Sequence, residues 1–86
     1  MNMQNIIELT QSSLYKERFK GEYFQLKIRY EKLTNMINKY DLKTLDFEPD
    51  CPIDLLRVQA RQMWEYMKTL EMRARYEHID LEENFE

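Results

Sequence analysis

The residues with the greatest potential for chemistry are the single cysteine and the single histidine, Cys51 and His78. A catalytic cysteine needs a neighbouring base, and a zinc site needs a cluster of ligands. Cys51 stands directly before Pro52, where a helix is predicted to begin, and His78 ends that helix about 40 Å away. The sequence therefore predicts no catalytic residue, no metal site and no cofactor. Cys51 is interpreted as a small, partly buried cap residue.

Binding chemistry is better represented, because basic and aromatic residues alternate along residues 14–40. Aromatic rings stack on nucleobases and cationic side chains hold phosphates. The candidate ligand-binding residues are Tyr15, Arg18, Phe24, Lys27 and Arg29. The alternative is that these side chains form a solvated helix face beside a core stripe. The chain has no glycine-rich loop, which excludes a phosphate-loop NTPase, and enzyme activity is not expected.

The charges are distributed unevenly along the 86 residues, whose formal net charge is −3. Residues 1–45 carry eight Lys/Arg and five Asp/Glu, while residues 46–86 carry five and eleven. This asymmetry indicates either two oppositely charged helices that attract each other or an anion site on the basic first helix. Net acidity argues against duplex DNA as a partner. With no long apolar run and no signal peptide, we expect a protein of the host cell cytoplasm, away from membranes.

Two apolar heptad seams define the elements that position these residues. The first is Phe19, Tyr23, Leu26, Tyr30, Leu33, Ile37 and Tyr40, and the second is Ile53, Leu56, Ala60, Met63, Met67, Leu70 and Ala74. Spacings of three and four place each set on one helical face. We therefore predict an all-α fold with one domain over residues 1–86. It is an antiparallel hairpin of a helix about 14–40, a corner at 41–51 and a helix about 52–78.

The corner and the chain ends carry helix-boundary signals. Pro52 suits the first helical position, with Cys51 or Asp50 as the cap and Asp54 in the first turn. The connector residues Leu42, Leu45 and Phe47 are expected to fold over the hairpin end. Asn5 followed by Glu8 predicts a short N-terminal helix, and Ser12 or Ser13 would cap the long helix after it.

Apolar residues remain outside both seams, and they predict an assembly. The interface candidates are Leu14, Gly21, Phe24, Ile28 and Trp64. Leu55, Val58, Met72 and Tyr76 also lie outside the second seam. A glycine inside a helix usually permits close approach of a backbone or ligand. We expect a helical-bundle homo-oligomer, with a host partner or a folded-back terminal segment as the alternatives.

The corner sequence resembles a family of small phage and prophage proteins grouped with a crAss-like phage protein. The shared pattern is T-L-D-F-x-P-x-C-P-I-[DE]-L-L, at residues 44–56, followed by Q-A-x-x-M-x-x-Y-x-x-x-L-E-x-R-A, at residues 59–74. The match covers most of residues 15–81 and implies a helical protein without implying a mechanism.

A second resemblance is to the phage anti-CBASS and anti-Thoeris sponges, which are short helical hairpins. Cys51–Pro52 and Met63–Trp64 are similar to their cysteine–proline corner and apolar M-x-W-like segment. The longer connector and the residues around the second helix differ, so no binding residue is transferred. The resemblance implies an oligomer that sequesters a cyclic or other signalling nucleotide. The alternative is an interaction module that blocks a host defence protein or serves phage assembly.

Overall fold

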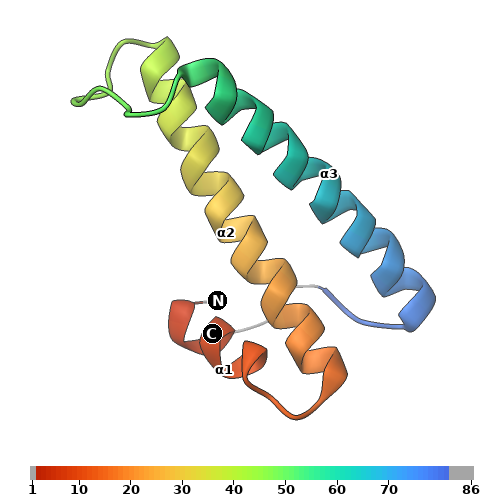
Figure 1. Ribbon diagram of the computed structural model, residues 1–86. Helices are drawn as coiled ribbons and strands as arrows, with labels where there is room; N and C mark the ends of the chain where they lie inside the picture. Colours follow the sequence, from red (N-terminus) through yellow and green to blue (C-terminus); the bar gives the residue numbers. More distant parts are fainter. Residues whose placement is uncertain (1, 82–86) are drawn as a thin grey trace.

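The computed structural model describes residues 2–81, and three helices make up most of that range. They are α1 (Met3–Thr10), α2 (Tyr15–Asp41) and α3 (Ile53–Glu77). Figure 1 shows α2 and α3 running side by side in opposite directions, with α1 beside the first turns of α2. The all-α prediction, with two long helices and a short N-terminal helix, is confirmed, and the long helices begin and end within one residue of the predicted bounds.

The predicted seams face each other between α2 and α3. Phe19, Tyr23 and Ile37 of the first seam are buried, as are Ala60, Met67, Leu70 and Ala74 of the second. Leu70 is fully buried at 0% exposure. Large rings on α2 thus meet small or flexible side chains on α3, and Tyr40 is the seam member left exposed at the corner end.

A second face of α2 is covered by α1. Phe24 is only 2% exposed and Ile6 of α1 only 1%, and both belong to the same core cluster. Gly21 explains the close approach, because a Cβ added there would lie 2.7 Å from both the Cγ2 and the backbone nitrogen of Thr10. The folded-back terminal segment, one of the alternatives to an oligomer, therefore covers this face.

This arrangement corrects part of the predicted oligomer interface. Gly21 and Phe24 are buried within the chain, and Ile28 packs partly buried against the same cluster. Leu14 and Trp64 are exposed, at 60% and 47%. The spacing correctly predicted a second apolar face on α2, but this face is covered by α1 of the same chain and not by a second chain.

The helix caps differ from the predicted ones. Asn2 caps α1 by accepting a hydrogen bond from the Asn5 backbone N–H at 2.9 Å. Leu14 precedes α2 without a side-chain cap, although Ser12 Oγ accepts from the Leu14 N–H at 3.0 Å. Pro52 is itself the N-cap residue of α3, because its extended backbone directs its carbonyl to the N–H groups of Leu55 and Leu56. Neither Cys51 nor Asp50 caps the helix.

The connector is more exposed than expected. Leu42 and Phe47 are 72% and 55% exposed, while Leu45 is half-buried, so the three do not fold together over the hairpin end. Cys51 is exposed rather than partly buried. Asp41 accepts two hydrogen bonds from Arg57, which joins the end of α2 to the start of α3. No helix within residues 2–81 has the length and apolar character needed to span a membrane.

Candidate functional site

A hollow of about 480 Å³ with mixed polar and aromatic lining lies at the open end of the hairpin, where α1 and α3 flank the first turns of α2. Its lining is Thr10, Tyr15, Arg18, Phe19, Glu22, Gln25 and Arg73. The first turns of α2 supply most of these side chains, and α3 supplies the arginine. The hollow combines aromatic rings, two guanidinium groups, an amide and a carboxylate in one place.

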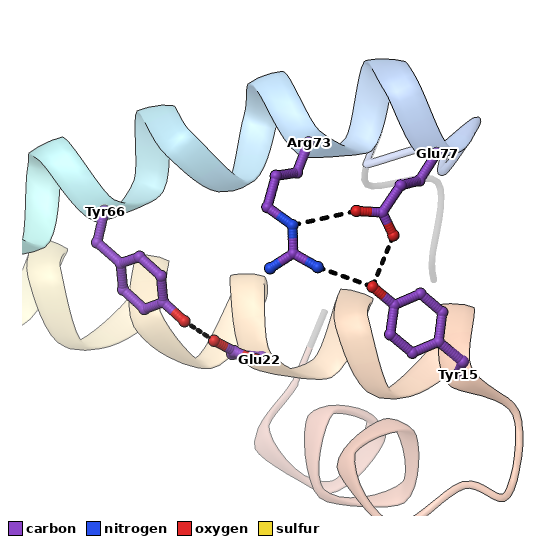
Figure 2. A network of polar contacts seen from close by, with 5 residues as sticks. All are labelled: Tyr15, Glu22, Tyr66, Arg73 and Glu77. Atoms are coloured by element: carbon purple, nitrogen blue, oxygen red, sulfur yellow. Dashed lines mark hydrogen bonds and ion pairs between the residues drawn. The ribbon is translucent and has the colours of Figure 1, made fainter.

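A hydrogen-bonded network crosses from α2 to α3 at this hollow (Figure 2). The Tyr15 hydroxyl donates to Glu77 Oε1 at 2.6 Å and accepts from Arg73 Nη2 at 2.8 Å. Arg73 Nε donates to Glu77 Oε2 at 3.1 Å, which closes the triangle. Further along the same side, Tyr66 donates to Glu22. The first three contacts place the Tyr15 hydroxyl and the Arg73 guanidinium against the Glu77 carboxylate.

The network also sets the charge states around the hollow. The hydrogen bond from Tyr15, together with the Arg73 guanidinium, lowers the pKa of Glu77. The same hydrogen bond to Glu77 raises the pKa of Tyr15, so its hydroxyl keeps its proton. The Arg73 guanidinium also lies 5.1 Å from the centre of the Phe19 ring, which is a cation–π distance. Arg73 is therefore a cation that is paired with Glu77 and lies beside the rings of Tyr15 and Phe19.

The structure brings together only part of the predicted ligand-binding set. Tyr15 and Arg18 line the hollow. Arg29 is exposed and lies eleven residues after Arg18, which places it on nearly the same helical face about 16 Å further along α2. Lys27, nine residues after Arg18, faces the opposite side of the helix. Phe24 is 2% exposed beneath α1, so it does not contribute to a surface site.

Sequence reasoning missed the contribution of α3. Arg73 and Glu77 lie on the acidic half of the chain, whereas the predicted ligand-binding residues all lie on the basic first helix. A signal was available in the sequence, because Arg73 and Glu77 are four positions apart and flank the seam residue Ala74. This spacing places both side chains on one helical face and favours an ion pair. Within residues 2–81, His, Cys, Asp and Glu side chains form no group of three or more that could hold a metal ion.

Taken together, the fold and the hollow define a small helical-hairpin protein with a hollow that is lined by side chains of all three helices. The chain belongs to the Sequestin family, whose model matches residues 13–76. The match covers α2, the corner and all of α3 except its last residue. α1 lies before the matched residues. No curated protein and no solved structure matches the chain.

The family name indicates the sequestering of a ligand, which agrees with the sponge-like role implied by the sequence resemblance. The match does not bear on the grouping with a crAss-like phage protein, and that grouping stays a prediction.

Proposed function

We propose that the protein is a non-enzymatic, phage-type counter-defence protein that binds and sequesters an immune signalling nucleotide in the host cell cytoplasm. The observation that carries the proposal is the hollow at the open end of the hairpin, where aromatic and guanidinium groups converge. Its volume of about 480 Å³ falls within the range of about 300–1,000 Å³ of small-molecule sites. Membership of the Sequestin family supports the same role.

The arrangement of the side chains suggests how a nucleotide would be held. The Tyr15 ring, 48% exposed, offers a stacking surface for a base. Arg18 donates one hydrogen bond, to the Ser12 carbonyl at 3.0 Å, and its remaining N–H groups are donors for a phosphate. Arg29, on nearly the same face of α2, would hold a second phosphate of a larger nucleotide. The proposed mechanism is binding without turnover.

Replacing Arg18 with alanine is expected to raise the Kd for a bound cyclic nucleotide by about ten- to a hundredfold, because each charge-assisted hydrogen bond contributes about 1.5–3 kcal/mol. Arg29→Ala should weaken a dinucleotide more than a mononucleotide. Isothermal titration calorimetry against cyclic mono- and dinucleotides measures both effects.

Arg61→Ala is the matched control, because Arg61 is an exposed arginine of α3 outside the hollow, and it forms an ion pair with Glu65 at 3.7 Å. It should leave the Kd unchanged. Recovery of the unaltered nucleotide after the protein is denatured would support sequestration, whereas a converted product would contradict it. Failure of the unmodified protein to bind any nucleotide of the panel would reject the proposed function.

The second candidate is an interaction module that blocks a host defence protein or serves phage assembly. Exposed apolar side chains favour it, notably Trp64 on α3 and Phe47 in the connector. Under this function, Trp64→Ala would reduce inhibition of the defence system while Arg18→Ala would not. The reverse pattern of effects supports nucleotide sequestration.

A further inference from the structure

Glu22 supplies a carboxylate to a hollow whose other lining groups are cationic, aromatic or neutral. It lies four positions after Arg18 on α2, so the two side chains share one face of the helix and are about 6 Å apart along its axis. The two charges engage different partners, because Arg18 donates to the Ser12 carbonyl at 3.0 Å and Glu22 accepts from the Tyr66 hydroxyl. An arginine that precedes a glutamate is also the less favourable order for an ion pair on a helix.

The Glu22 carboxylate can accept further hydrogen bonds. An ionised carboxylate has about four acceptor sites, and Tyr66 occupies one of them, on Oε2. Figure 2 shows the Tyr66–Glu22 contact on the same side of the hairpin as Tyr15 and Arg73. The Glu22 side chain is exposed, so a ligand in the hollow has access to its remaining acceptor sites.

A carboxylate beside an anion-binding arginine selects among ligands by their charge and their donors. It repels a second phosphate, and it accepts a strong hydrogen bond from a hydroxyl. In a nucleotide the hydroxyl nearest to the phosphate belongs to the ribose, because the sugar joins the phosphate to the base. Dinucleotide-binding folds use the same chemistry, since an Asp or Glu there binds the ribose 2′-hydroxyl, whereas an arginine accommodates a 2′-phosphate.

We propose that Glu22 is a specificity-determining residue, whose carboxylate accepts a hydrogen bond from the free ribose 2′-hydroxyl of the nucleotide that Arg18 holds. The ligand class is a ribonucleotide with an unmodified 2′-hydroxyl, in preference to deoxyribonucleotides and 2′-phosphorylated nucleotides. This inference rests on the proposed function and narrows its ligand.

The position of Tyr15 favours the sugar over the base as the donor to Glu22. An exocyclic amino group of a base also donates hydrogen bonds, but the proposed stacking surface for the base is the Tyr15 ring. Tyr15 stands three positions before Arg18, and so lies about 10 Å from Glu22 along the axis of α2. The sugar, which lies between phosphate and base, is the nearer group to Glu22.

Paired calorimetric titrations of the full chain test the inference. The probes are cyclic AMP, cyclic GMP, cyclic di-AMP and cyclic di-GMP, each beside its 2′-deoxy counterpart. For the unmodified chain, loss of the 2′-hydroxyl is expected to raise the Kd about ten- to a hundredfold, the range for one hydrogen bond to a charged group. For Glu22→Ala the ribo and deoxy forms should bind equally. The measured quantity is the ratio of two Kd values for one variant, so a fraction of unfolded protein does not change it.

Tyr66→Phe is the matched control, because it breaks the same hydrogen bond between α2 and α3 but leaves the carboxylate in the hollow. Urea unfolding should show similar stability losses for Tyr66→Phe and Glu22→Ala, whereas only Glu22→Ala should lose the preference for the ribo form. Arg18→Ala should weaken both forms by the same factor. Loss of the preference in Tyr66→Phe as well would mean that Glu22 acts by joining the helices, which overturns the inference.

The remaining outcomes separate this inference from the proposed function. The inosine analogue of a bound probe lacks the exocyclic amino group, and its Kd relative to that probe should be the same with and without Glu22. A ratio that changes with Glu22→Ala assigns the residue to the base and overturns the inference. Equal binding of ribo and deoxy forms by the unmodified chain also overturns it, but leaves the proposed function intact. Binding of none of the probes rejects both.

Discussion

Replacing Phe24 with alanine is expected to lower the free energy of unfolding by about 3 to 5 kcal/mol. Phe24 is only 2% exposed and lies in the core cluster with Ile6 and Leu70. Its ring also contacts Tyr23 edge-on, with 5.2 Å between ring centroids. Truncation would remove apolar burial and leave a cavity beneath α1. For a chain of this size, the loss is a large fraction of the total stability, which is about 5–15 kcal/mol for typical domains.

Phe47→Ala is the matched control for this substitution. It removes the same atoms from a connector residue that is 55% exposed, and we expect a loss of about 1 kcal/mol or less. Urea unfolding followed by far-UV circular dichroism measures both losses. All variants are compared at one protein concentration, because association would add to the apparent stability. Equal losses for the two variants would show that Phe24 is not in the core.

Replacing Gly21 with leucine is expected to displace α1 and to lower the free energy of unfolding by about 2 to 4 kcal/mol. The new side chain would occupy the place of the Thr10 backbone, since even a Cβ would lie 2.7 Å from its nitrogen. Displacement would uncover Ile6, which is 1% exposed, and Phe24. Helix propensity acts in the opposite direction, because leucine gains up to about 1 kcal/mol over glycine in a helix interior.

The opposing contributions can be separated with a shortened chain that begins at Ser12 and so lacks α1. In that chain the steric conflict is absent, and Gly21→Leu should stabilise by up to about 1 kcal/mol. Gly21→Leu is therefore expected to lower the free energy of unfolding when α1 is present and to raise it when α1 is absent. The same unfolding experiment measures both effects. If the shortened chain loses as much stability as the full one, Thr10 is not the cause.

The sequence was sufficient to predict the two long helices and the seam residues that pack between them. Unbroken spacings of three and four have one helical interpretation, and the buried residues of both seams confirm it. The partner of the second apolar face was harder to predict. Gly21 and Phe24 showed that something packs closely there, but periodicity does not distinguish a second chain from α1 of the same chain.

The connector and the caps depended on local backbone geometry that residue types describe poorly. Pro52 was placed inside the helix, yet its backbone is extended and its carbonyl accepts the first hydrogen bonds. Leu42 and Phe47 are apolar but find no surface to cover at the corner end. For the candidate site, Tyr15 and Arg18 were predicted from α2 alone, whereas Arg73 joins them only because the hairpin brings residues nearly sixty positions apart into contact.

The position of the main core cluster has a consequence for how the hairpin forms and opens. The cluster lies at the open end, where residues 19–24 meet residues 67–79, while the corner end holds the exposed Leu42 and Phe47. Closing from the corner buries Ile37 and Ala60, but the main cluster forms only when segments about fifty residues apart in the chain meet, which slows folding. Partial opening is expected to begin at the corner, so amide hydrogens near the connector should exchange with solvent earlier than those around Leu70.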